Sequence, residues 1–428
     1  MRISLVVTVA MLVFARDSAA QNVSVMAQAI PTITSARPTA TRGNLTEAYL
    51  TQPAIMVHAS WAGFTGIGTL NLEGLTLERG ELTTGAYGEG YVDRRHPHAY
   101  VHELLAGRDV TATRDFSFSV FGGRGFAPFG SDDPMVRPIE KYPVNHHLSQ
   151  VLERIVGVGA LRYRKTMLEV GTFNGDEPLG PGAPPNLARF GDSWSTRLTV
   201  LPLNALEVSG SLASVRSPEV RAGGGLDQWK HSVTARYERV SGDNGVYGMA
   251  EWSHTDERDR GVTVNRLGSV LGEGSVCRAG AILSGRWERT DRPEEEPTLD
   301  PFRTPRPPSD LSNLGESRWT ILTGAVSSPA LRSGWLSGRP FVEVAYITAA
   351  RGHPGGLFDP VARYGTSHLW MLSAGVRLHA GASGMHDRMG RYGVALPVAM
   401  AMQGMAGMQD MSGMQHTQPS MGSDRCRL

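Results

Sequence analysis

The sequence predicts an all-β protein, in the form of an antiparallel transmembrane β-barrel of about 14 to 16 strands with long external loops. Three observations support this fold class. Apolar and polar residues alternate with a period of two along most of the chain. No segment after the N-terminus reaches the roughly 18 uninterrupted apolar residues that a transmembrane helix needs. Short turns and long polar connections alternate between the runs, as they do in membrane barrels.

The N-terminus has the pattern of a secretory signal peptide. A basic start precedes the apolar residues 3–15, a run that is too short to span a bilayer. Small residues at 18–20 suit a signal peptidase, so residues 1–20 are expected to direct export and then to be removed. Because the period of two begins only at Ala54, residues 21–53 are expected to form a flexible N-terminal segment.

Residues 54–380 carry the strand pattern and are expected to form the barrel. Over residues 232–238, apolar and polar side chains alternate strictly, which sorts them onto the two faces of a strand but scatters them around a helix. The count of about fifteen strands is odd, whereas bacterial single-chain barrels have even numbers. Either one run is misassigned or the segment before Ala54 supplies a further strand. The other runs lie at residues 54–64, 67–77, 98–106, 113–122, 148–161, 165–173, 193–201, 206–213, 245–254, 262–272, 275–289, 317–328, 340–350 and 366–379.

The connections between the runs differ in length. Short turns are predicted around Asn204, Asp243 and Glu273, where Gly and Asn residues tolerate a positive φ angle. Short turns at one rim and long loops at the other are typical of a membrane barrel, although a soluble β-sandwich or propeller has a similar strand pattern. Long polar links are predicted at residues 123–147, 174–192, 216–228, 290–316 and 351–365.

Charged residues within the strands are expected to point into the lumen. They form a balanced mixture of acids and bases, which argues for a channel with little charge selectivity. The same residues are equally suited to brace a plugged lumen. The expected inward set is Glu169, Arg197, Glu207, Lys230, Arg236, Glu238, Glu251, Arg286, Glu288, Glu343 and Arg377.

Histidines cluster at one junction between a predicted loop and a predicted strand. Pro97 disfavours a helix there, and in a strand His98 and His102 share a face while Glu103 lies on the opposite face. Neutral imidazoles at this spacing suit zinc or copper. The candidate ligands, two of them from a second histidine pair, are His96, His98, His102, His146 and His147. The alternative is a loop-anchoring hydrogen-bond network that uses Asp93, Arg94, Arg95 and Glu103.

Residues 381–428 lack the strand pattern and are expected to form a disordered tail that is rich in methionine and histidine. Thioether sulfur is a soft ligand that suits Cu(I), so copper is the candidate metal for this tail. The alternative is a low-complexity extension that binds no ligand. The candidate ligands recur at every third position, at Met402, Met405, Met408, Met411 and Met414.

Several other features argue against particular functions. A net charge of +1 gives no reason to expect nucleic-acid binding. The chain has no Gly-x-Ser-x-Gly motif, and Ser253 and His254 point to opposite faces of a strand, which argues against a lipid hydrolase and against an enzyme in general. Cys277 and Cys426 have no spacing that indicates a zinc site or a disulfide, so we expect no disulfide.

Four stretches of the chain carry a resemblance to known sequences. They are residues 93–104, which contain Asp-Arg-Arg-His-Pro-His; residues 127–147, which begin Ala-Pro-Phe-Gly and end Asn-His-His; residues 171–178, Gly-Thr-Phe-Asn-Gly-Asp-Glu-Pro; and residues 386–393. Together they resemble a family of uncharacterised Gram-negative outer-membrane β-barrel proteins, over residues 54–393.

The resemblance implies a place in the outer membrane and a connection with copper and heavy-metal resistance. Two departures from the family are visible. Ala99 stands where the family has an acid, which weakens any transfer of a ligand set that relies on that carboxylate, and the chain is about a hairpin shorter after Phe64, which would explain the odd strand count. The expected function is a porin-like channel for small solutes or ions, with outer-membrane lipid and small solutes or metal ions as partners. The alternative is a metal-binding outer-membrane component without channel activity.

Overall fold

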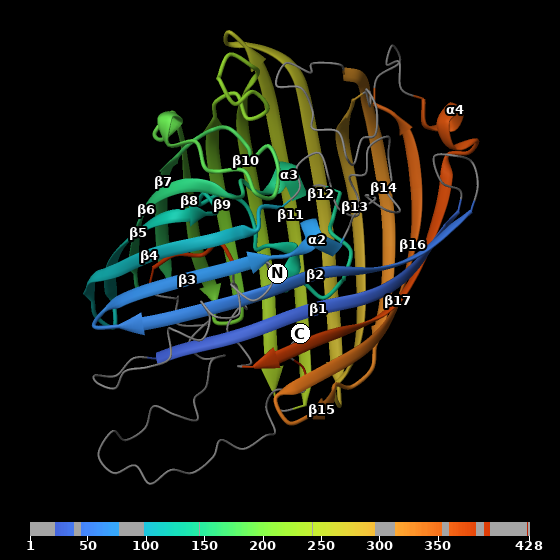
Figure 1. Cartoon of the computed structure of the whole chain (residues 1–428), viewed down its shortest axis with the longest axis horizontal. Helices are drawn as coiled ribbons and strands as arrows, with labels where there is room; N and C mark the ends of the chain where they lie inside the picture. Colours follow the sequence, from blue (N-terminus) through green and yellow to red (C-terminus); the bar gives the residue numbers. More distant parts are fainter. Residues whose placement is uncertain are drawn as a thin grey trace, which may run out of the picture.

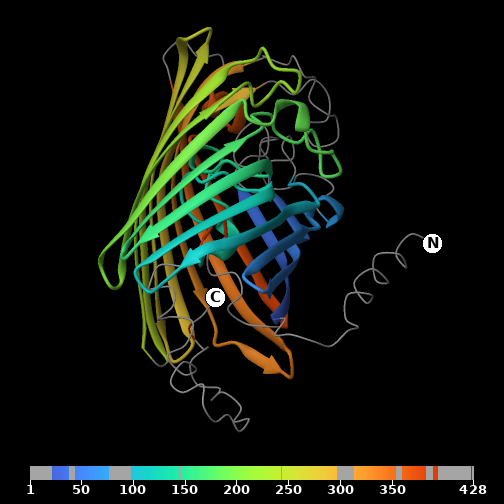
Figure 2. The ribbon, with the colours of Figure 1, turned by 90° about the vertical axis from the view of Figure 1, so that its left-hand side faces the viewer.

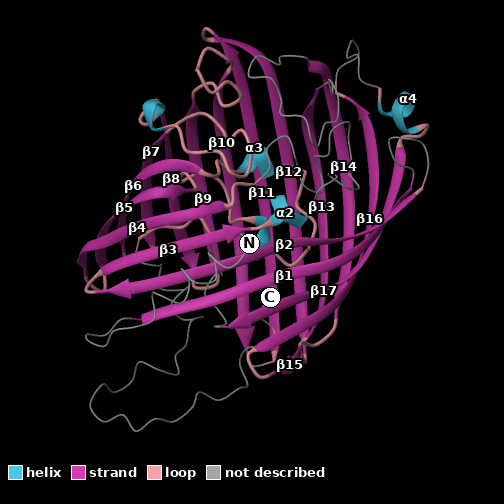
Figure 3. Cartoon of the chain, in the orientation of Figure 1, coloured by secondary structure: helices cyan, strands magenta, loops and turns pink. Residues whose placement is uncertain are grey.

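Sixteen antiparallel strands close into a barrel in the structure, which is a computed structural model of the chain (Figures 1 and 3). This confirms the predicted all-β fold class and strand number. No helix among the described residues is long and apolar enough to cross a membrane. The structure describes residues 22–37, 44–76, 98–144, 146–241, 243–295, 313–352, 359–381, 389–393 and 426.

The strands follow one another around the barrel in chain order. β15 (Leu331–Ser333) pairs with β16, as β14 does, so β14 and β15 count as one strand of the barrel. Short helices occupy the connections, namely α2 (Glu73–Thr76), α3 (His146–Ser149), α4 (Pro360–Tyr364) and the 3-10 turns η1 (Pro134–Val136) and η2 (Leu187–Arg189). The other strands are β1 (Asn22–Arg37), β2 (Leu45–Trp61), β3 (Phe64–Asn71), β4 (Val101–Ala112), β5 (Phe116–Gly125), β6 (Arg154–Tyr163), β7 (Thr166–Phe173), β8 (Ser193–Leu203), β9 (Leu206–Val215), β10 (Asp227–Ser241), β11 (Asn244–Asp259), β12 (Val262–Arg278), β13 (Ala281–Glu295), β14 (Asn313–Ser327), β16 (Leu336–Arg351) and β17 (His368–Gly381).

β1 closes the barrel, because it pairs with β17 on one side and with β2 on the other. The expectation of a flexible segment over residues 21–53 is therefore wrong for residues 22–37 and 45–53, which lie in strands. Their alternation is present but weak, since small residues such as Ala27 and Ala29 interrupt the apolar face. β1 is the additional strand that raises the predicted count of fifteen to an even number. The predicted signal peptide lies outside the described residues.

Long connections lie at one rim of the barrel and short turns at the other, and we name these the loop rim and the turn rim (Figures 1 and 2). The turns predicted around Asn204 and Asp243 fall between strands as expected. The turn predicted at Glu273 is wrong, because this residue lies within β12, faces inward and pairs with Arg286 at 3.7 Å. The chain turns instead after Arg278, where Ala279 and Gly280 both have positive φ angles.

The barrel wall is apolar outside and polar inside. Large apolar side chains such as Leu198, Val233 and Trp252 are exposed on the outer surface. The residues between them in sequence, mostly serine, threonine and charged residues, are buried. All members of the predicted inward set are buried or half-buried. This inversion of the usual protein pattern is what a barrel surrounded by lipid requires.

The connection between β5 and β6 folds into the barrel. We name its residues 126–153 the inserted segment. Nearly all of them are buried, and α3 near their end lies against β11 and β12, across the lumen from β5 and β6 (Figure 1). The long link predicted at residues 123–147 is therefore an internal segment and not an external loop.

Charged side chains of the wall satisfy the backbone of the inserted segment. Glu343 accepts a hydrogen bond from the backbone N–H of Glu140 at 3.2 Å, and Arg286 donates to the carbonyl oxygen of Lys141 at 2.7 Å. Buried peptide groups need such partners, because an unpaired one costs free energy comparable to a lost hydrogen bond. Of the two roles expected for the inward charges, these contacts favour the bracing of material in the lumen.

A short C-terminal stretch around Gly390 also lies inside the barrel. Arg197 pairs with Glu169 at 2.7 Å and donates to the carbonyl oxygen of Gly390 at 2.7 Å. Glu169 accepts from the backbone N–H of Tyr392 at 3.0 Å, and the Tyr392 hydroxyl donates to the carbonyl oxygen of Phe126 at 2.5 Å. One buried ion pair thus joins the wall, the C-terminal stretch and the inserted segment.

Cys277 on β12 and Cys426 form a disulfide, although 149 positions separate them in sequence. The expectation of no disulfide is therefore wrong, because a bond between such distant positions leaves no local spacing pattern. A disulfide agrees with the expected export, since these bonds persist in oxidising compartments. Apart from residues 381, 389–393 and 426, the tail predicted over residues 381–428 lies outside the described residues.

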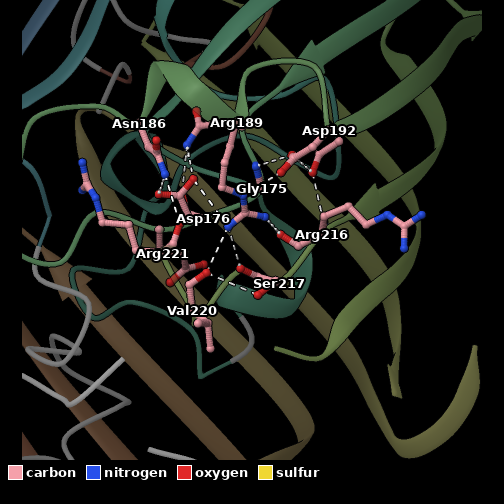
Figure 4. A network of polar contacts seen from close by, with 12 residues as sticks. Gly175, Asp176, Asn186, Arg189, Asp192, Arg216, Ser217, Val220 and Arg221 are labelled. Atoms are coloured by element: carbon pink, nitrogen blue, oxygen red, sulfur yellow. Dashed lines mark hydrogen bonds and ion pairs between the residues drawn. The ribbon is translucent and has the colours of Figure 1, made fainter. Parts of the chain in front are cut away.

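Two connections at the loop rim are joined by a polar network (Figure 4). Arg189 in the β7–β8 connection donates to Asp192 at 2.7 Å and forms an ion pair with Asp176 at 3.7 Å. The same guanidinium group donates to the carbonyl oxygen of Val220 in the β9–β10 connection at 3.0 Å. Asn186 links Asp176 with the second connection in the same way. The network fixes this part of the rim around the lumen.

The Glu169–Arg197 pair provides a first test of the buried network. Arg197→Ala is expected to lower the free energy of unfolding by about 3 to 5 kcal/mol, because it leaves the carboxylate of Glu169 buried without its partner. Urea unfolding of the detergent-solubilised barrel measures this change.

Arg164→Ala is the matched control, because the pair of Arg164 with Asp115 at 4.0 Å is exposed at both ends. Exposed pairs contribute little, so this variant is expected to unfold like the parent. Equal losses in the two variants would contradict the role assigned to the Glu169–Arg197 pair.

Candidate functional site

Three of the predicted histidine ligands lie close together. His98 precedes β4 and His102 is in its second position; both are buried, and their ring centroids are 5.2 Å apart. The ring of His146, in α3, is 6.4 Å from that of His98. The remaining candidates lie outside the described residues, or have side chains that do: Asp93, Arg94, Arg95, His96, His147, Met402, Met405, Met408, Met411 and Met414.

A β-bulge turns His102 toward the interior. Thr69 of β3 pairs with Glu103, while the next residue, Leu70, pairs with Val101, so β4 has one extra residue at His102. The expectation that Glu103 lies on the opposite face from His102 is therefore wrong, and both side chains are buried inside the wall. A bulge breaks strict alternation and re-aims the side chain at which it occurs. Glu103 accepts a hydrogen bond from Thr69 at 2.8 Å.

Glu153 is the centre of the histidine cluster. Its Oε1 atom lies 2.7 Å from Nδ1 of His102 and 3.3 Å from Nδ1 of His98, and it accepts from the backbone N–H of Ala99 at 2.7 Å. The residue itself has a φ angle of 58°. A positive φ is uncommon for a residue other than glycine and persists where surrounding contacts hold the backbone in place.

Asp133 lies on the other side of the His102 ring. Its Oδ2 atom is 3.8 Å from Nε2 of His102, which is too long for a hydrogen bond, and Nε2 has no hydrogen-bond partner although its side chain is 0% exposed. The second carboxylate oxygen of Asp133 accepts from the backbone N–H of Met135 and caps η1. The cluster therefore joins β4, the root of β6 and the first turn of the inserted segment.

The charges of the cluster depend on one another. Burial alone raises the pKa of Glu153, but hydrogen bonds from His102 and His98 outweigh it and hold the pKa well below its usual range. Burial lowers the pKa of His98, whereas the hydrogen bond and negative charge of Glu153 raise it more, so the net shift is upward. The pKa of Asp133, which burial raises, is lowered overall by the facing His102. Without a metal ion, the cluster thus favours charged carboxylates beside protonated imidazoles.

Sequence reasoning missed the two acids of this cluster. Glu153 falls in a run predicted as a strand, and its inward direction depends on a positive φ angle that the sequence does not reveal. Asp133 belongs to a link predicted to be external. In the sequence, each of the two is an acid close to a proline or to an apolar run. Acids in such positions are too common to identify a site. In the described part of the chain, one group of three side chains has possible metal-donor atoms within 4.8 Å of one another, and it consists of His98, His102 and Glu153.

Glu153→Gln tests whether this carboxylate holds the cluster together. The amide keeps the shape of the side chain but removes the charge, so the free energy of unfolding is expected to fall by about 1 to 3 kcal/mol in the presence of a chelator. Chemical unfolding measures the change, and hydrogen exchange at the Ala99 N–H is expected to become faster.

Asp256→Asn serves as the control for this substitution. Asp256 lies 3.2 Å from His254, so the pair has the same chemistry as His102 with Glu153, but both side chains are partly exposed. The control is expected to change stability much less, because solvent screens the pair. If the two variants lose the same stability, Glu153 is not the centre of the cluster.

Comparisons with known proteins identify the fold. No family model matches the chain, and no curated protein matches it. The family resemblance of the four stretches therefore stays a prediction.

Solved structures do match the chain. It is similar to the anion-selective porin from Comamonas acidovorans, with a TM-score of 0.50 and 10% sequence identity over 85% of this chain and 100% of that chain. OmpT of Vibrio cholerae in its trimer form gives a TM-score of 0.45 and 13% identity over 84% and 100% of the two chains. OccK5 (OpdH) of Pseudomonas aeruginosa gives a TM-score of 0.37 and 8% identity over 84% of this chain and 98% of that chain. At such identities the likeness concerns the fold alone, and the fold of this chain is that of a porin-like, 16-stranded β-barrel.

Proposed function

We propose that the protein is a porin-like channel of the bacterial outer membrane that passes small solutes or ions through a lumen narrowed by the inserted segment. The observation that carries the proposal is a closed barrel with an apolar outer surface and a polar, charged interior. An apolar outer surface suits lipid, and a polar interior suits water and its solutes. The similarity to the Comamonas acidovorans porin supports the fold on which this function rests.

The inserted segment determines how much of the lumen is open to solutes. It is held from several sides: Ser211 on β9 accepts from the N–H of Gly130 at 2.9 Å, and Arg377 on β17 donates to the carbonyl oxygen of Arg137 at 3.3 Å. A segment fixed to opposite parts of the wall narrows the path without being free to swing out. Solutes that pass are therefore expected to be small.

The charges of the lumen support weak selectivity. Acids and bases of the lumen lie close to one another, both within the wall, as in the contact of Arg286 with Glu288 at 3.4 Å, and between the wall and the inserted segment, as in that of Glu251 with Arg137 at 3.6 Å. Such pairing favours weak selectivity, because rings of charge of one sign are what discriminate cations from anions. The alternative function, a metal-binding component without channel activity, remains the outcome if no conductance is found.

Planar-bilayer recording tests the channel function. The purified, folded barrel is expected to produce stepwise increases in conductance, because each barrel that inserts into the bilayer adds one open path for ions. In a gradient of KCl the reversal potential is expected to lie near zero, since neither ion is favoured. Detergent without protein is the control. A barrel that is folded by circular dichroism but silent would falsify the channel function.

Shortening the inserted segment tests its role in narrowing the lumen. Replacing residues 132–142 by a short Gly-Ser linker removes buried bulk from the lumen, so the single-channel conductance is expected to increase. Substitution of Gly180 and Gly182 by alanine, where an added Cβ meets open space in the β7–β8 connection, is the control and is expected to leave conductance unchanged. An unchanged conductance in the folded linker variant would mean that the segment does not limit the path.

A further inference from the structure

We propose that His98, His102 and Glu153 bind one divalent transition-metal ion of the Zn²⁺ class, and that Asp133 orients His102 for this role. The site lies where the C-terminal end of the inserted segment, directly before β6, contacts β4, so the ion would link this end of the segment to the barrel wall. The proposal does not depend on channel activity, because metal binding and conductance are measured separately.

The three side chains direct their donor atoms at one another. Nδ1 of His98 and Nδ1 of His102 both face Oε1 of Glu153, and one possible donor atom from each of the three residues lies within 4.8 Å of the other two. Two imidazole nitrogens and one carboxylate oxygen are ligands that Zn²⁺ prefers. Three protein ligands leave the fourth position of a tetrahedral ion for water.

The distances suit such an ion with a small adjustment. Bonds of about 2.0 to 2.1 Å to a tetrahedral Zn²⁺ place neighbouring donor atoms about 3.3 Å apart. The distance between Nδ1 of His98 and Oε1 of Glu153 already has this value, 3.3 Å. That between Nδ1 of His102 and the same oxygen is 2.7 Å and must increase by about 0.6 Å. A small rotation of the Glu153 side chain suffices for such a change.

Asp133 gives an independent indication of metal binding. If Nδ1 of His102 binds a metal ion, the ring proton is on Nε2, and this is the atom that faces the Asp133 carboxylate at 3.8 Å. A metal-bound histidine commonly donates its other N–H to a carboxylate, which fixes the ring and its tautomer. The buried Nε2 atom has no hydrogen bond in the structure, so a closer approach of Asp133 would satisfy it.

The backbone of Glu153 adds a third indication. Its φ angle of 58° places the residue in the left-handed region, which is costly for a side chain of this size. The position nevertheless holds a glutamate, whose carboxylate reaches both histidines and the N–H of Ala99. Such conformations concentrate at binding sites, where the function of the side chain requires an unusual direction of the backbone.

A cluster without metal is the competing account. In that account, protonated His98 and His102 form ion pairs with Glu153 and Asp133 and hold the segment by charge alone. Both accounts make Glu153 important for stability. Only the metal account makes the cluster bind one Zn²⁺ ion, and only in that account does Asp133→Asn weaken Zn²⁺ binding.

Titration calorimetry of the full-length barrel distinguishes the two accounts. The detergent-solubilised protein is stripped with a chelator and titrated with Zn²⁺, and Co²⁺ is used in parallel for its visible absorption in tetrahedral sites. The parent is expected to bind one tight Zn²⁺ per chain. Asp133→Asn is expected to weaken binding about 10- to 100-fold, and His102→Ala by more than that.

His254→Ala is the matched control, since His254 also lies beside a carboxylate, 3.2 Å from Asp256, and is expected to leave the tight site intact. Zn²⁺ is also expected to raise the Tm of the parent but not that of His102→Ala, because an ion that binds only the folded state stabilises it. If His102→Ala does not fold, Asp133→Asn still carries the test, because it keeps all three ligands.

The proposal is overturned if the parent binds no Zn²⁺, or if the folded Asp133→Asn and His102→Ala variants bind it as tightly as the parent does. Equal binding would place the metal elsewhere in the chain, as for a site made of surface histidines or of tail methionines.

Discussion

The structure depends on the match between charged side chains of the barrel wall and the peptide groups of the inserted segment. A connection buried inside a barrel cannot hydrogen-bond to bulk water, so its N–H and carbonyl groups need partners from the wall. The wall supplies acids where the segment presents N–H groups, as Glu288 does for Val144 at 2.9 Å. It supplies arginines where the segment presents carbonyl groups, as Arg286 does for Lys141. Because an unpaired buried charge is itself costly, wall and segment stabilise each other.

The histidine cluster lies at the point where this arrangement is attached to the wall. His102 belongs to β4, Glu153 directly precedes β6, and Asp133 belongs to the inserted segment. Further inside the lumen, side chains of the wall hydrogen-bond to the backbone of the segment. The cluster instead holds the end of the segment next to β6 through contacts between side chains. A structural role and a metal-binding role are compatible here, since a bound ion would tighten the same three connections.

Strand alternation is the part of the fold that the sequence predicts well. It depends only on the direction of successive side chains in an extended chain, and it predicts the inward charges correctly. It failed at β1, where alanines blur the contrast between faces, and at Glu273, where a Gly-Glu-Gly stretch looked like a turn but continues β12. The external position expected for residues 123–147 failed because polar composition suits a solvated loop and a charged lumen equally well.

The candidate site was less predictable, for reasons that concern geometry. The histidines were visible in the sequence, but their direction depends on a bulge opposite Thr69 and their central partner on one positive φ angle. Neither feature leaves a mark in residue type. The disulfide of Cys277 with Cys426 escaped for the same reason, since it joins distant positions that only the closed barrel brings together.

Two neighbouring aspartates connect the cluster with the far side of the lumen. Asp133 faces His102, while Asp132 accepts from Arg236 on β10 at 2.5 Å and from Arg391 in the C-terminal stretch at 2.9 Å. Because the two residues are adjacent in the backbone, their contacts hold the same point of the inserted segment from two directions. The position of the inserted segment is thus set by a balance between β4 on one side and β10 with the C-terminal stretch on the other. A metal ion bound by His102 would strengthen the contacts on the β4 side of this balance.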